Sequence, residues 1–223
     1  RKHAAQDQND TRMNARIEAF ELAFRMQMEA PAAIDLTGET KRTMELYGIG
    51  QGPTDNFGRQ CLLARRLVER GVRFVQCSHS YKWDQHGNLR GGHTANAREV
   101  DQPIAALIRD LRQRGMLDET LVVAVGEFGR SPQRGVSTSG NANTNDGRDH
   151  WPYCYTGLMA GAGVQGGQVY GKSDSTASTP FENPVHPRDI LATVYHTLGI
   201  DPRTEVLNHL DQPRGIDRQG ESQ

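Results

Sequence analysis

The segment TLVVAVGEFGR, residues 120–130, joins an unbroken apolar run to a glycine-flanked pair of charged side chains. An apolar run without polar alternation is typical of a strand that is covered on both faces in an α/β protein. Glu127 and Arg130 follow this run directly. Because ligands of open α/β sheets collect at the carboxyl ends of strands, the segment predicts a functional site at its end.

Helical and strand patterns alternate on both sides of this segment. Apolar residues recur at helical spacing in four stretches: 11–30, a segment that ends at Gly71, 97–114 and 188–200. Short runs rich in β-branched and aromatic residues predict further strands: VRFVQCS at 72–78, YCYTGLMAG at 153–161 and GGQVYG at 166–171. This alternation predicts a three-layer α/β/α domain with a largely parallel central sheet.

The length of 223 residues suits one domain, because single cores commonly extend to about 250 residues. We therefore predict a single domain over residues 1–223, with a polar tail at 201–223. The sequence opens on Arg1 rather than Met, which indicates a processed or truncated product. Its three cysteines are few and widely spaced, so we expect buried free thiols at Cys61, Cys77 and Cys154 rather than a disulfide framework.

The charge balance argues against two classes of partner. Lys and Arg number 26 against 27 Asp and Glu, so no excess of positive charge predicts binding to nucleic acid or to an anionic membrane. No apolar run approaches the roughly 18 residues that a membrane-spanning helix needs. We expect neither a nucleic acid partner nor a membrane span.

Three segments carry the side chains that bind metals. WDQHG at 83–87 supplies Asp84 and His86, and GRDHW at 147–151 supplies His150. Two imidazoles and one carboxylate form the open three-ligand set of catalytic zinc sites. We predict that these residues bind a divalent cation, with zinc as the first choice and manganese or calcium as alternatives. GEFGR supplies Glu127, which we predict to be a further ligand or a general base.

Each of these residues has a structural alternative. Asp84 suits a helix N-cap or an Asx turn, and His86 suits a turn. His150 can pack on its neighbour Trp151, and Glu127 can form an ion pair with a nearby arginine. Other side chains are candidates for supporting roles: His79 and His93 as replacement ligands, Asp101 and Asp149 as partners that orient a ligating imidazole.

Taken in order, the motifs WDQHGN, LDETLVVAVGEFGRSP, GRDHW, VYG and NPVHPRDILATVYHTLGI resemble the domain-of-unknown-function 1501 family over residues 57–200. That family resembles alkaline phosphatases, sulfatases and cofactor-independent phosphoglycerate mutases. The resemblance implies an alkaline phosphatase-like fold lacking its N-terminal portion, with Asp84, His86 and His150 on one metal. It also implies export from a bacterial cell. The sequence departs from the superfamily at Phe128, where a metal-binding histidine is usual, and no N-terminal nucleophile strand is recognisable.

The leading prediction for function is a metal-dependent hydrolase of sulfate or phosphate esters, acting on a small-molecule or glycan substrate. Arg130 and Arg148 flank the predicted ligands, and a guanidinium binds such oxyanions bidentately. The polar stretch 131–145 is predicted to be a lid over the site. The alternative is a non-catalytic relative that binds an anionic glycan or a partner protein.

Overall fold

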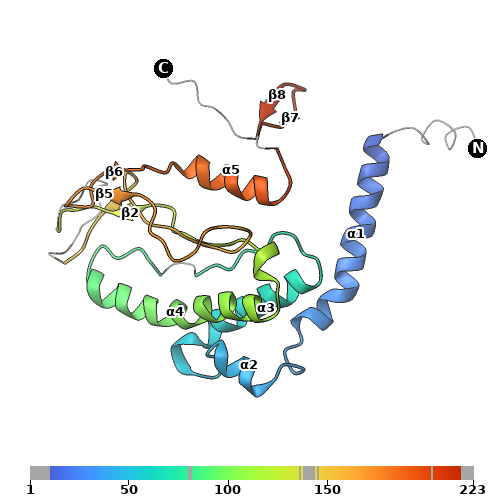
Figure 1. Ribbon diagram of the computed structural model, residues 1–223, viewed down its shortest axis with the longest axis horizontal. Helices are drawn as coiled ribbons and strands as arrows, with labels where there is room; N and C mark the ends of the chain where they lie inside the picture. Colours follow the sequence, from blue (N-terminus) through green and yellow to red (C-terminus); the bar gives the residue numbers. More distant parts are fainter. Residues whose placement is uncertain are drawn as a thin grey trace, which may run out of the picture.

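The computed structural model describes residues 11–79, 82–135, 137, 144, 146–201 and 203–216. Its largest helical contact joins α3 (Asp55–Glu69) to α4 (Leu89–Gln113). The C-terminal end of α1 (Thr11–Ile34) contacts α3, while the rest of α1 projects away from the other helices (Figure 1). In the same view the hairpin of β7 (Glu205–Leu207) and β8 (Pro213–Gly215) lies on the side of α5 (Pro187–Thr197) that faces away from α4. Among the described residues, no helix is long and apolar enough to cross a membrane.

The apolar core lies between α3, α4 and the turn that follows the short helix α2 (Lys41–Leu46). Its buried members are Tyr47, Ile49, Phe57, Cys61, Leu62 and Ala106. Helical spacing puts Phe57 and Cys61 on one face of α3, which is the face that packs on α4. The short 3-10 helices η2 (Gly52–Thr54) and η3 (Leu117–Glu119) precede α3 and follow α4.

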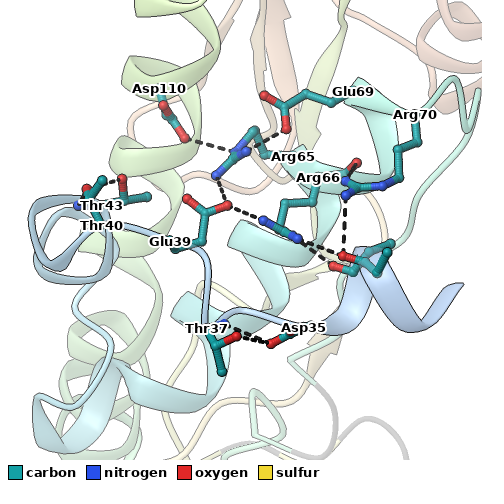
Figure 2. Close-up of polar contacts among 12 residues, drawn as sticks. Asp35, Thr37, Glu39, Thr40, Thr43, Arg65, Arg66, Glu69, Arg70 and Asp110 are labelled. Carbon is teal, nitrogen blue, oxygen red and sulfur yellow. Dashed lines mark hydrogen bonds and ion pairs between the residues drawn. The ribbon is translucent and has the colours of Figure 1, made fainter. Parts of the chain in front are cut away.

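A buried ionic network fastens the same helices together (Figure 2). The Arg65 side chain is 2% exposed and pairs with Glu39 at 2.8 Å, Glu69 at 2.5 Å and Asp110 at 3.1 Å. Asp110 also accepts a hydrogen bond from the Tyr47 hydroxyl at 3.0 Å. The network therefore joins the turn before α2 to both α3 and α4, and each buried charge has a partner of opposite sign.

The predicted fold class is wrong. Every strand pair in the described residues is antiparallel and two-stranded: β1 (Val122–Ala124) with β4 (Leu158–Ala160), β2 (Gly129–Arg130) with β3 (His150–Trp151), β5 (Lys172–Ser173) with β6 (Pro180–Glu182), and β7 (Glu205–Leu207) with β8 (Pro213–Gly215). Such pairs do not make a three-layer, alkaline phosphatase-like domain around a large parallel sheet.

The segments that were predicted from their apolar content to be strands of a central sheet do not have strand neighbours on both edges. Residues 72–79 form no strand, and Phe74 is 67% exposed. Residues 166–171 form none either, and Val169 is 93% exposed. The apolar run at 120–126 pairs with β4 over three residues alone. Composition reports that a segment can be buried, but strand formation also requires hydrogen-bonding partners from distant parts of the chain.

The predicted helices are present, with changed limits. α1 continues past Pro31 to Ile34, and α4 begins at Leu89 rather than at residue 97. α5 ends at Thr197 rather than at residue 200. It begins with a capping box: the His186 side chain accepts a backbone N–H of the first turn, and the His186 backbone N–H donates to the Asp189 carboxylate at 2.7 Å. The tail beyond residue 201, expected to be polar, contains the β7–β8 hairpin.

Candidate metal centre

Two loops meet at the candidate site. Asp84 and His86 precede α4, and His150 begins β3, where it pairs with Arg130 of β2. The loops are joined directly, because Thr144 donates its backbone N–H to the His86 carbonyl at 3.0 Å and Asn88 donates to the Asp146 carboxylate at 2.9 Å.

Gly147 allows this close approach. A Cβ atom at this position would overlap the carbonyl oxygen of His86, so only glycine lets the two backbones lie together. Gly129 of β2 likewise allows a close approach, because a Cβ atom there would overlap the carbonyl oxygen of Cys154. The glycines that open GRDHW and precede Arg130 therefore set the distance between the ligand-bearing segments.

The structure brings together the three predicted metal ligands. The Asp84 Oδ1 atom lies 2.6 Å from His150 Nε2 and 3.1 Å from His86 Nε2. One ligand atom from each residue lies within 4.8 Å of the others. Asp84, His86 and His150 thus form a triad that can hold a metal ion.

The spacing of these atoms suits a cation after a small adjustment. A tetrahedral ion with bonds of about 2.1 Å holds its ligand atoms about 3.4 Å apart. The Asp84 pairs, at 2.6 Å and 3.1 Å, are closer than this because they are hydrogen-bonded or ion-paired with each other. An opening of less than about 1 Å in either pair would meet the spacing of the ion.

The surroundings stabilise the ionised carboxylate of Asp84. Its hydrogen bond with His150 lowers the pKa of the Asp84 carboxyl group, and Arg130 adds to the effect with an Nη2 donor at 3.1 Å. The Asp84 side chain is 62% exposed, whereas the His86 side chain is 19% exposed. The site therefore presents a deprotonated carboxylate on its open side and an imidazole on its covered side.

Asp149 contacts both histidines of the triad, His86 and His150. It is fully buried, accepts the backbone N–H of His150 at 2.9 Å, and lies with Oδ1 at 3.9 Å from His86 Nδ1. This is the side of the His86 ring opposite the nitrogen that faces Asp84. Asp149 therefore lies beside the His86 ring, and its role in orienting a ligating imidazole stays a prediction.

Phe128 packs directly on one of the ligands. Its ring centroid lies 4.4 Å from that of His150, which in turn lies 5.1 Å from that of His86. The residue that departs from the superfamily pattern therefore limits the movement of the His150 ring. A phenyl ring cannot bind a cation through a lone pair, so its contribution is packing.

The two arginines bind protein acceptors. Arg130 donates to the backbone carbonyls of Trp83 and, at 3.1 Å, of Arg148, besides its contact with Asp84. Arg148 donates to the Ser131 carbonyl at 3.0 Å. Arg130 thus lies against the metal triad, and Arg148 holds the start of the 131–145 stretch. Recognition of an oxyanion by either residue stays a prediction.

The other candidates lie outside the triad. Glu127 is exposed in the loop between β1 and β2, and its carboxylate is not part of the cluster. His79 interacts with Glu99 at 2.9 Å, and the ring of His93 packs on Trp83 at 5.4 Å. Asp101 is exposed on α4. The roles predicted for Glu127 remain predictions.

Most of the predicted lid, residues 131–145, lies outside the described residues. The contacts that the sequence patterns did not predict are at the end of this stretch, where Thr144 and Asp146 hold the 86–88 turn. The sequence feature that could have indicated these contacts is Asn-Asp-Gly at 145–147, a combination typical of turns, which overlaps the start of GRDHW.

The sequence matches the family described as "Protein of unknown function (DUF1501)" over residues 1–222. No curated protein and no solved structure gives a significant match to the chain.

Proposed function

The chain belongs to the DUF1501 family, and from this premise we propose that it is a metal-dependent hydrolase of sulfate or phosphate esters. The observation that carries the proposal is the convergence of Asp84, His86 and His150, whose ligand atoms lie within 4.8 Å of one another. Two imidazoles and one carboxylate leave at least one position open to substrate, as in catalytic zinc sites. A divalent cation supplies Lewis acidity that polarises a phosphoryl or sulfuryl oxygen.

Zinc suits this ligand set best. Imidazole nitrogen is a preferred ligand of zinc, whereas calcium is bound by oxygen ligands in six- to eightfold coordination. Manganese, which accepts carboxylate and imidazole ligands, is the second choice. The orientation of His86 by the buried carboxylate of Asp149 is also a frequent feature of zinc sites.

The positions of charged residues support an anionic substrate. Arg130 lies at 3.1 Å from Asp84 with its side chain 14% exposed, so its positive charge is next to the open side of the triad. We assign to Arg130 the binding of an ester oxyanion once a cation draws the Asp84 carboxylate away from it. Glu127, exposed on the neighbouring loop, is the candidate general base that accepts a proton from the attacking water.

A second function has its own support. Arg130 already donates to two backbone carbonyls, and Glu127 lies outside the triad. Both features suit a non-catalytic protein in which the cation holds the two loops together and the surface binds an anionic glycan or a partner protein. The two functions differ in turnover but not in metal binding.

The decisive experiment combines metal analysis with an activity assay. The purified protein is freed of metal, loaded with zinc, manganese or calcium, and assayed with chromogenic phosphate and sulfate monoesters. We expect one bound ion per chain and hydrolysis that depends on it. His150→Ala should lose both, while His196→Ala, an exposed histidine of α5, should keep both. Metal binding without turnover of any ester would favour the non-catalytic function, and absence of metal binding would refute both.

A further inference from the structure

Two of the three cysteines lie together at the edge of the core, away from the metal triad. Cys61, on α3, is 2% exposed. Cys77, in the segment 72–79, packs against the same apolar cluster. Each thiol acts on the other as a hydrogen-bonding partner that shifts its pKa.

Neighbouring contacts hold this arrangement in place. The Cys77 thiol lies 3.5 Å from the carbonyl oxygen of Gln60, the residue just before Cys61. The next residue, Ser78, donates its backbone N–H to the Gln60 side chain at 3.1 Å. Cys77 is therefore fixed beside the turn of α3 that carries its partner.

We propose that Cys61 and Cys77 are a reversible dithiol–disulfide site, oxidised by exchange with low-molecular-weight disulfides and reduced by thiols. Hydrogen-bonded thiols need little movement to form a bond, whereas cysteines on diverging segments cannot be joined without backbone rearrangement. The bond would close a loop that contains the second half of α3 and the turn that leads from it to residues 72–79.

The two thiols differ in reactivity. The hydrogen bond from Cys61 lowers the pKa of Cys77, while the same hydrogen bond, together with burial, raises the pKa of Cys61. Cys77 is also the more exposed of the two. Since the thiolate is the nucleophile, Cys77 attacks first and Cys61 resolves.

The reaction balances as two thiol–disulfide exchanges. The Cys77 thiolate attacks one sulfur of oxidised glutathione, which forms a mixed disulfide and releases one glutathione thiolate. Cys61 then loses its proton and attacks the Cys77 sulfur, which forms the Cys61–Cys77 bond and releases the second glutathione. The protein loses two electrons and two protons, and one oxidised glutathione becomes two reduced molecules.

Oxidation should restrain residues 72–79, which are not held by a helix or a strand of their own. Residues 72–79 form no strand, and Phe74 and Gln76 are exposed. The cross-link ties this segment to α3, so its amide hydrogens should exchange more slowly in the oxidised protein. A loop of this length predicts a rise in melting temperature of about 5–10 °C.

Thiol counting on the full chain tests the proposal without any variant. Under reducing conditions a thiol reagent in denaturant should titrate three cysteines, the number in the sequence. After incubation with oxidised glutathione it should titrate one, and peptide mapping should find the 61–77 cross-link with Cys154 alkylated. Dithiothreitol should restore all three. Three free thiols after oxidation, or a cross-link that includes Cys154, would overturn the proposal.

Matched variants test the order of attack. Cys61→Ala should stop at a mixed disulfide on Cys77, seen as one added glutathionyl group. Cys77→Ser should remain unmodified at buried Cys61. Cys154→Ser, the control, should form the same cross-link as the wild type. A glutathionyl group on Cys61 in Cys77→Ser would show that the assigned order is wrong.

Discussion

Asp84 Oδ1 lies 2.6 Å from Nε2 of His150, although the two residues are 66 positions apart in the chain. The contact joins the loop before α4 to the first residue of β3. A carboxylate and an imidazole already paired at this distance need little rearrangement to receive a cation. Metal binding then competes with the hydrogen bond between Asp84 and His150.

Removal of His150 should reduce zinc affinity by more than about 100-fold, because changes even in the residues behind a ligand cost about 10- to 100-fold. Titration calorimetry of the metal-free protein measures this, with His196→Ala as the control. Unchanged zinc affinity in His150→Ala would exclude His150 as a ligand.

Gly147→Ala should abolish high-affinity metal binding while leaving the helical core folded. The added Cβ would overlap the His86 carbonyl oxygen and force the two loops apart. The core between α3 and α4 lies elsewhere and should keep its helical circular dichroism. Gly166→Ala is the matched control, because a Cβ there meets no atom within 4 Å. Full metal affinity in Gly147→Ala would contradict the proposed arrangement of the loops.

The triad was predictable because its signal is chemical and local. Ligand-type residues stand in loops, at WDQHG and GRDHW, where no packing pattern explains them. The glycine of GRDHW is the point of closest approach between those loops. Residue type and loop position are therefore enough to identify Asp84, His86 and His150 as a possible ligand set.

The sheet was not predictable in the same way. The apolar content of residues 72–79 and 120–126 reports a preference for burial, while pairing depends on what the rest of the chain offers as neighbours. Helical periodicity was more reliable, but it does not show what a helix faces. Phe20 and Phe24 of α1 have the spacing of an inner face and are 71% and 63% exposed.

Arg65→Met should destabilise the protein by about 3 kcal/mol, the lower end for a broken buried pair, because Glu39 and Asp110 lose their shared cation and keep Arg66 and Arg114 as cationic partners. Urea unfolding measures the change. Arg59→Met is the matched control in the same helix, since its pair with Asp55 is exposed at 46% and 37% and should contribute no more than about 1 kcal/mol. Equal losses in the two variants would show that burial does not decide the strength of these pairs.

The same network predicts a loss of stability in acid. Burial alone would raise the pKa of Glu39, but hydrogen bonds from Arg66 and Arg65 outweigh it and lower the pKa below the ordinary value of 4.5. A carboxyl group with a lowered pKa stabilises the folded state fully above its unfolded pKa and progressively less as the pH falls through its folded pKa. The difference in unfolding free energy between wild type and Glu39→Gln should therefore shrink below about pH 4.5. A constant difference down to strongly acidic pH would contradict this linkage.

Glu127→Gln separates the two roles predicted for Glu127, general base and metal ligand. If Glu127 accepts the proton of the attacking water, the amide, which cannot accept it, should lower kcat by about 100- to 10,000-fold. Zinc content should stay at the wild-type level, because the carboxylate is outside the cluster of Asp84, His86 and His150. Glu119→Gln, an exposed glutamate in η3, is the control and should leave both quantities unchanged. Unchanged turnover with unchanged zinc would remove Glu127 from the chemistry, whereas loss of zinc would make Glu127 a ligand that joins the triad when the ion is bound.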